Sequence, residues 1–113
     1  MKLVILESPY AATTLYSVEE HIRYARAGVR ACLLLGESPI ASHLLYTQAG
    51  ILDDLTPEER RLGIEAGLAW RRVADATVVY QDYGISPGMQ YGIERAEATG
   101  LPIIYRSLPG FPK

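Results

Sequence analysis

Side chains that can carry out chemistry gather in three short stretches of the sequence, and each stretch follows or ends a short apolar run. Residues 7–10 are Glu-Ser-Pro-Tyr, residues 42–46 are Ser-His-Leu-Leu-Tyr, and residues 82–89 are Asp-Tyr-Gly-Ile-Ser-Pro-Gly-Met. Carboxylates and histidine can move protons, hydroxyls can bind polar groups, and tyrosine rings can stack on a flat ligand. These stretches supply the candidates for catalysis, Glu7, His43 and Asp82, and the candidates for ligand binding, Ser8, Tyr10, Ser42, Tyr46, Tyr83, Ser86, Gly88 and Met89.

Each of the three titratable candidates also has a structural interpretation. Asp82 could act as a base or accept a hydrogen bond from a ligand hydroxyl, but an aspartate in a turn often bonds to its own loop. Glu7 ends an apolar run, where an unpaired charge is costly, so it either serves the site or pairs with Arg106 or another basic residue. His43 could be a general acid or base, or a histidine held by structural hydrogen bonds. A serine triad with His43 and Asp82 is disfavoured, because the chain lacks the Gly-x-Ser-x-Gly turn.

Short apolar runs alternate with helical patterns along the whole chain. The runs predict strands at 3–6, 39–46, 76–80 and 101–106, and the helical patterns begin after Ser17, Thr56 and Ser86. This alternation predicts a parallel sheet with right-handed crossovers, in a three-layer flavodoxin- or Rossmann-like α/β domain with strand order 2-1-3-4. In such sheets the ligand crevice lies beyond the carboxyl ends of the strands where the order reverses, here between the first and third strands.

The first and third helical segments have clear start signals. Ser17 and Ser86 can each cap the helix that follows, and Pro87 suits the first helical position. The free N–H groups at the start of the third helix could bind a phosphate, a carboxylate or a sugar, although an ordinary capped turn has the same sequence features. His21, on the first helix, is expected on or beside the solvent face.

The second helical segment has an apolar face and two glycines. Its predicted apolar face consists of Leu62, Ala66, Ala69, Trp70 and Val73. Gly63 and Gly67 permit another backbone to approach closely, in helix-on-sheet or dimer packing. The preceding stretch, residues 48–55, has no strong period and could fold over the site as a flap.

Composition limits the class of protein. The chain has 113 residues (12.5 kDa), of which 49% are hydrophobic and 21% charged, and this predicts one packed domain spanning 1–113. A net charge of −2 argues against binding to nucleic-acid polymers, and no apolar run is long enough to span a membrane, so a soluble cytoplasmic protein is expected. Cys32 has no partner for a disulfide, the two histidines are too few for a zinc site, and no phosphate or dinucleotide glycine motif is present, so we expect no metal and no cofactor. With eight tyrosines, some would lie near any crevice by chance.

Motifs shared with known families extend over most of the chain. Ala-Asp-x-x-Val-Val from Ala74, Ser-x-Gly-Met-x-x-x-Ile-x-x-Ala from Ser86 and Gly-x-Pro-Ile from Gly100 resemble the nucleoside 2-deoxyribosyltransferase-like superfamily, which includes the 2′-deoxynucleoside 5′-phosphate N-hydrolases. Glu-Ser-Pro-Tyr-Ala, Pro-Ile-Ala-Ser-His-Leu-Leu-Tyr, Glu-Arg-x-x-Gly-Ile-x-Ala-Gly-Leu-Ala-Trp and Tyr-x-Asp-x-Gly-Ile-Ser-x-Gly-Met resemble a small family of bacterial and phage domains with no assigned activity.

The first resemblance implies a nucleoside or nucleotide ligand and cleavage of its N-glycosidic bond. In that superfamily a glutamate early in the helix after the third strand attacks the anomeric carbon and forms a glycosyl-enzyme. Alignment on Gly88 and Ala96 places this position at Gly92, and alignment on the Gly-Met pair places it at Gln90; neither residue is a carboxylate. Glu94 lies about 200° around a helix from Gly92 and should face elsewhere.

Three functions therefore stay open. The first is an N-glycosidase or deoxyribosyltransferase-type enzyme in which Glu7 or Asp82 contacts the sugar, Tyr10 or Tyr83 stacks on the base, and His43 donates a proton. The second is a non-catalytic sensor or sequestering module for a nucleotide-derived ligand, and the third is an oligomeric scaffold without a ligand. The resemblance implies oligomers whose neighbouring subunits help to complete the site, and a short domain has exposed sheet edges, so we expect a homodimer or a higher homo-oligomer.

Overall fold

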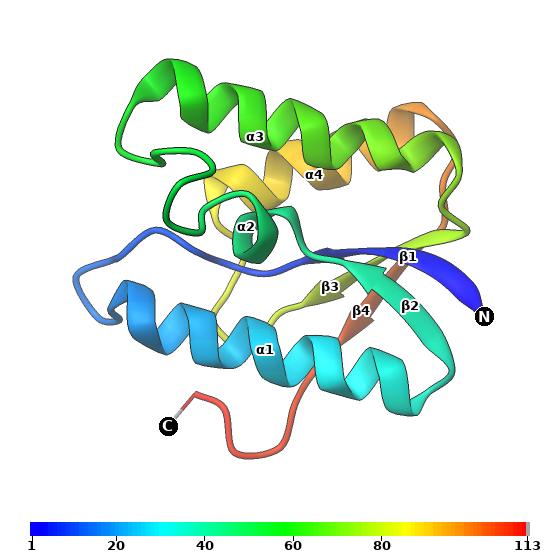
Figure 1. Cartoon of the computed structure of the whole chain (residues 1–113). Coiled ribbons are helices and arrows are strands. Elements are labelled where there is room, and N and C mark those ends of the chain that lie inside the picture. The colour runs from blue at the N-terminus through cyan, green and yellow to red at the C-terminus, as the bar shows by residue number, and fades with distance from the viewer. Residues whose placement is uncertain (113) are drawn as a thin grey trace.

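The computed structural model describes residues 1–112 and has one parallel four-stranded sheet between two layers of helices (Figure 1). The strands are β1 (Lys2–Glu7), β2 (Glu37–Ile40), β3 (Ala76–Tyr80) and β4 (Ile103–Arg106). The helices are α1 (Val18–Leu34), α2 (Ser42–Leu45), α3 (Pro57–Ala69) and α4 (Pro87–Ala98), with a 3₁₀ turn, η1, at Trp70–Arg72. Helix α1 covers one face of the sheet, and α3 and α4 lie over the other (Figure 1). None of the helices within residues 1–112 is long and apolar enough to cross a membrane.

The strand order β2-β1-β3-β4 confirms the order predicted from the sequence. Val4 of β1 lies opposite Pro39 of β2 on one side and opposite Ala76 of β3 on the other. Because the order reverses between β1 and β3, the carboxyl ends of these two strands frame the crevice. All the residues of β3 are buried, as expected for a strand that is covered on both faces.

The predicted helix starts are confirmed. The hydroxyl oxygen of Ser17 accepts a hydrogen bond from the N–H three residues on, at 3.1 Å, and that of Ser86 does the same at 3.2 Å. Helix α3 begins at Pro57, although the side chain of Thr56 makes no capping hydrogen bond. These caps determine where each helix leaves the loop before it, and so position the loops that form the site.

The second strand is shorter than the prediction of 39–46. It ends at Ile40, and Ser42–Leu45 forms the short helix α2 instead of a continuing strand. Helix α2 packs directly on α3: the side chain of Ser42 lies so close to Gly67 that a Cβ at Gly67 would overlap it. Tertiary packing therefore decides the structure of a segment whose local sequence favours a strand.

The apolar face predicted for the second helix is largely exposed. Leu62 is 58% and Trp70 46% exposed, whereas the buried residues of α3 are Gly67 and Leu68. The helix turns its glycines inward so that α2 and the segment before α3 can approach it closely, and this orientation leaves the larger apolar side chains outside. The buried face carries glycines beside Leu68, and glycines add nothing to an apolar pattern, so the sequence pattern points to the wrong side of the helix.

The prediction that His21 faces solvent is wrong. Its side chain is 1% exposed, and its Nδ1 lies 3.2 Å from the carbonyl oxygen of Tyr10 and 3.1 Å from that of Ala11. Carbonyl oxygens only accept hydrogen bonds, so Nδ1 carries the proton and donates. The buried imidazole thus ties the loop after β1 to helix α1.

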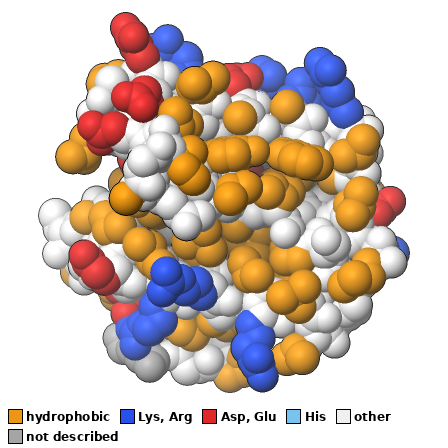
Figure 2. Space-filling model, viewed as in Figure 1, with side chains coloured by type: hydrophobic (Ala, Val, Ile, Leu, Met, Phe, Trp, Pro, Cys, Tyr) orange, Lys and Arg blue, Asp and Glu red, His pale blue; other side chains and the backbone are white. Residues whose placement is uncertain are grey.

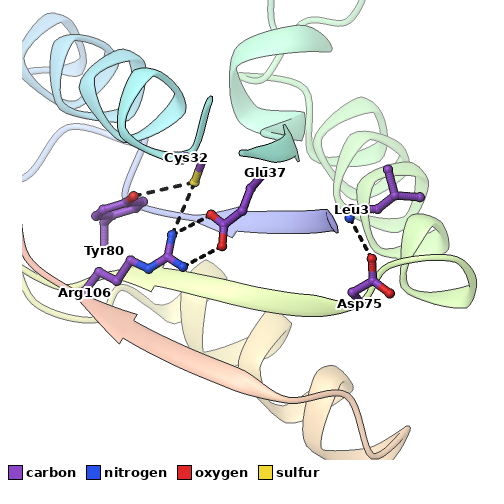
Figure 3. A network of polar contacts seen from close by, with 6 residues as sticks. All are labelled: Leu3, Cys32, Glu37, Asp75, Tyr80 and Arg106. Atoms are coloured by element: carbon purple, nitrogen blue, oxygen red, sulfur yellow. Dashed lines mark hydrogen bonds and ion pairs between the residues drawn. The ribbon is translucent and has the colours of Figure 1, made fainter. Parts of the chain in front are cut away.

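A partly buried ion pair joins the two edge strands beneath α1. Arg106 of β4 donates to the two carboxyl oxygens of Glu37 of β2 at 2.7 and 2.6 Å, beside Cys32 and Tyr80 (Figure 3). These hydrogen bonds hold the pKa of Glu37 below its ordinary value. The expected alternative of an ion pair between Glu7 and Arg106 is therefore wrong.

Candidate functional site

A cavity of about 590 Å³ opens at the carboxyl ends of β1 and β3, where the topology predicts the ligand site. Its walls come from residues 8–16 after β1, from α2, from residues 46–54, from α3 and from residues 83–89. The volume lies within the range of about 300–1,000 Å³ that is usual for small-molecule sites. On the side of the molecule drawn in Figure 2, hydrophobic side chains gather over the middle, and acidic side chains lie over the start of α3.

The three predicted stretches meet at this cavity. All the predicted site residues except Asp82 line it, namely Glu7, Ser8, Tyr10, Ser42, His43, Tyr46, Tyr83, Ser86, Gly88 and Met89. They come together because parallel strands deliver the segments that follow them to the same edge of the sheet. Their roles in binding or catalysis remain predictions.

Asp82 lies outside the cavity lining, and its hydrogen bonds join separate segments of the chain. Its Oδ2 accepts hydrogen bonds from the hydroxyl of Tyr24 at 2.6 Å and from the N–H of Leu108 at 2.8 Å. Its own N–H donates to the hydroxyl oxygen of Tyr24 at 2.9 Å. These contacts tie the segment after β4 to α1 and leave Asp82 away from a ligand in the cavity.

Glu7 ends β1 at the floor of the cavity and lies against α4. A Cβ at Gly92 would lie 2.7 Å from the carboxyl carbon of Glu7 and would overlap its Oε2. The carboxyl group therefore occupies the space in which a side chain at position 92 would begin. Within residues 1–112 it makes no hydrogen bond and no ion pair, and burial raises its pKa to about 8.

Ser8 and His43 form a hydrogen-bonded pair in the same wall. Ser8 Oγ and His43 Nε2 are 2.7 Å apart, and the tautomer of the imidazole determines which of the two atoms donates. Burial lowers the pKa of His43 to about 4, so the ring is neutral at pH 7. A neutral imidazole has one donor and one acceptor nitrogen, so the pair can hold a polar group of a ligand or pass on a proton.

Aromatic rings form a further wall of the cavity. Tyr83 packs edge-to-face on Tyr16, with the ring centroids 4.6 Å apart, and on His21, with the centroids 5.5 Å apart. Tyr10 lies edge-on to His43 at a centroid distance of 6.5 Å. Such rings offer apolar faces and polar edges, which suit a flat heteroaromatic ligand.

Residues that close the cavity on the α3 side carry no motif that marks them in the sequence. Leu52, Asp54, Glu59 and Arg60 line this side, and the segment expected as a flap supplies the first two. Burial raises the pKa of Asp54, and the charge of Arg60 opposes this shift. The sequence feature that pointed here is the expected flap at residues 48–55, and Gly63 lets α3 approach it, because a Cβ at Gly63 would lie 3.2 Å from the Leu52 side chain.

The start of α4 offers few donors to an anion. Ser86 Oγ accepts the N–H of Met89 at 3.2 Å, and Pro87 has no N–H, so within the described chain Gly88 keeps the one free donor of the first three helical positions. A single N–H suits a hydroxyl or a carbonyl oxygen better than a phosphate. Among residues 1–112, no three His, Cys, Asp or Glu side chains are grouped to hold a metal ion.

The chain has relatives at the level of family and at the level of fold. Residues 2–106 match the profile of a family described as a domain of unknown function, DUF7768. The chain belongs to the DUF7768 family. No curated protein matches it.

This DUF7768 domain has the fold of a solved enzyme. The 2-deoxyribosyltransferase from the psychrotolerant bacterium Bacillus psychrosaccharolyticus matches it with a TM-score of 0.66 and 17% sequence identity, over 96% of this chain and 74% of that chain. The match confirms the predicted resemblance at the level of the fold.

Proposed function

We propose that this domain binds a nucleoside or nucleotide and cleaves its N-glycosidic bond, with Glu7 acting at the anomeric carbon. One observation carries the proposal. The Glu7 carboxyl lies against Gly92, which is one of the two positions, with Gln90, at which the resemblance to the deoxyribosyltransferases implies the reactive glutamate. The shared fold with a 2-deoxyribosyltransferase supports a ligand of the nucleoside type.

The reaction needs a carboxyl group at one point in space, and more than one backbone position can supply it. In this chain α4 provides the space at Gly92, and the end of β1 provides the acid. A glutamate at position 92 could not coexist with the present position of Glu7, because its Cβ would overlap the carboxyl. The two residues are thus matched to each other.

The rest of the cavity has partners for both ends of a nucleoside. The rings of Tyr10 and Tyr83 line it and can pack on a base. The Ser8–His43 pair and the free N–H of Gly88 can hydrogen-bond to sugar hydroxyls or to heteroatoms of the base. A few convergent polar groups in an otherwise apolar cavity are typical of small-molecule sites.

Detection of free base by chromatography tests the proposal, with ribonucleosides, deoxynucleosides and their 5′-monophosphates as probes. Glu7→Gln keeps the size of the side chain but cannot ionise, and it should slow base release by about 100-fold or more. Glu94→Gln is the matched control, because Glu94 is an exposed glutamate of α4 and its loss should leave the rate unchanged. Base release that survives Glu7→Gln, or no release from any probe, would contradict the proposal.

A second candidate function is ligand binding without turnover. It is favoured by the raised pKa of Glu7, which leaves most of the carboxyl protonated at pH 7, and by the glycine at position 92. A sensor of this kind should be stabilised against thermal unfolding by nucleosides at millimolar concentration and should release no base. A scaffold without a ligand should show neither stabilisation nor release.

A further inference from the structure

We infer that His21 determines which bases the site accepts, because its Nε2 accepts a hydrogen bond from an amino group on the base. This role rests on the proposed function, since it takes the cavity as the place where a nucleoside binds. It adds the substrate class, which is nucleosides whose base carries an exocyclic amine. One polar atom of His21, left without a partner by the fold, carries the inference.

One nitrogen of His21 is committed to the fold. Nδ1 donates to the carbonyl oxygens of Tyr10 and Ala11, at 3.2 and 3.1 Å, and holds the loop after β1 against α1. Among residues 1–112 no carboxylate forms an ion pair with the ring, and a buried charge without a partner is costly. The imidazole is therefore neutral with its proton on Nδ1, and the lone pair of Nε2 can only accept a hydrogen bond.

The second nitrogen of His21, Nε2, opens onto the cavity. Within residues 1–112 every fully buried side-chain nitrogen or oxygen has a hydrogen-bond partner, and Nε2 has none there. It is therefore not fully buried, although the residue as a whole is only 1% exposed. Because His21 lines the cavity, the small surface that stays exposed faces a ligand in it. The cavity wall thus contains a recessed acceptor that the described part of the chain leaves unpaired.

Two tyrosines place this acceptor beside a surface on which a base can pack. The ring of His21 lies edge-to-face on Tyr83 at a centroid distance of 5.5 Å and is tilted against Tyr16 at 6.1 Å. All three rings line the cavity. The donors and acceptors of a base lie on its edge, so a base packed on Tyr83 has His21 among its polar neighbours. In the proposed function the sugar lies at Glu7, and the donor that meets Nε2 therefore belongs to the base.

An exocyclic amine is the donor that suits a recessed acceptor. The amino groups of adenine, guanine and cytosine project beyond the ring. The ring N–H of uracil or thymine instead lies between two carbonyl oxygens, which would meet the lone pair of Nε2 first and repel it. A site that accepts a hydrogen bond from its substrate rejects an analogue without the donor, because the buried acceptor is then left unpaired. His21 therefore favours amino bases.

Pairs of nucleosides that differ by one amine test the inference. Isothermal titration calorimetry on the whole chain, which reports both binding and turnover, compares 2′-deoxyadenosine with purine 2′-deoxyriboside, 2′-deoxycytidine with 2-pyrimidinone 2′-deoxyriboside, and 2′-deoxyguanosine with 2′-deoxyinosine. We expect the amine to tighten binding about tenfold in at least one pair. Equal affinity within every pair would overturn the inference while leaving the proposed function in place. Absence of binding by all six nucleosides would overturn the proposed function, and the inference with it.

Two variants separate the contact with the ligand from the tie to the loop. His21→Asn keeps an N–H donor near the position of Nδ1 and removes Nε2, so the preference for the amine should fall to about twofold or less in a folded chain. His21→Gln carries an amide oxygen near the position of Nε2, so it should keep the preference while the weakened tie to the loop lowers the midpoint of thermal unfolding. A purely structural role would weaken both members of a pair equally. An unchanged affinity ratio in His21→Asn would therefore contradict the inference, whether or not His21→Gln folds.

Discussion

Gly92→Ala is the smallest change that tests whether the Glu7 carboxyl lies on α4. The added methyl would lie 2.7 Å from the Glu7 carboxyl carbon, which is too close, so one of the two groups must move. At an unobstructed helix position the alanine would stabilise the chain by about 1 kcal/mol, because glycine is a poor helix former. Overpacking costs about 1–3 kcal/mol, here at the lower end because the carboxyl is the mobile end of a side chain that can swing into the cavity.

A double-mutant cycle separates these two effects. In the Glu7→Ala background the three atoms nearest to the methyl are gone, and Gly92→Ala should raise the free energy of unfolding by about 1 kcal/mol. In the wild-type background the same change should leave that free energy unchanged or lower it by up to about 2 kcal/mol, so the coupling between the two positions is about 1–3 kcal/mol. Urea denaturation followed by far-UV circular dichroism measures both values. Equal stabilisation in the two backgrounds would refute the contact between Glu7 and Gly92.

Titrations and contacts in the rest of the structure lead to four more expected outcomes. Burial raises the pKa of Glu7 from 4.5 to about 8. The stability that the protonated Glu7 contributes is therefore complete below pH 4.5 and is lost as the pH rises through 8, by at most about 1.4 kcal/mol per pH unit. Glu7→Gln should remove this dependence of the free energy of unfolding on pH. Burial lowers the pKa of His43 from 6.5 to about 4, so its contribution is present above pH 6.5 and is lost as the pH falls through 4; an imidazole that is charged at pH 5.5 by NMR would contradict this. Asp82→Ala should lower the free energy of unfolding by about 3 kcal/mol, because two donors lose a charged acceptor, and a loss below about 0.5 kcal/mol would exclude these bonds. Arg106→Met should lower it by about 1–3 kcal/mol by leaving the Glu37 carboxylate without its partner, and adding Glu37→Leu should recover most of that loss.

The fold could be predicted because its elements are specified within a few residues each. A short apolar, branched run marks β1, β3 and β4, and Ser17 and Ser86 mark the starts of two helices by the hydrogen bonds that their side chains accept. Right-handed crossovers then leave few ways to order four parallel strands. The place of the cavity followed from that order, because a sheet whose strand order reverses has its crevice at the reversal.

Contacts between separate segments determine the orientation of several side chains that local sequence patterns predicted wrongly. His21 occupies a polar position in a helical pattern, and only the carbonyls of the loop after β1 make it an inward residue. Leu62 and Trp70 resemble a core face, but α2 packs on the opposite side, where Gly67 leaves room for it. Asp82 resembles a site residue at a strand end, and its partners come from α1 and from the segment after β4. In each case the deciding partner lies outside the window that a sequence pattern covers.

The contact between Glu7 and Gly92 bears on the glutamate that the helix motif lacks. A glycine inside a helix costs about 1 kcal/mol relative to alanine, and a half-buried carboxyl without a partner also lowers stability. Stability alone would favour alanine at position 92 and an apolar residue at position 7. The two unfavourable choices lie against each other, and Glu7 of the pair lines the cavity. Departures from local rules that compensate each other are expected where function maintains them, and the pair therefore supports the proposed role of Glu7.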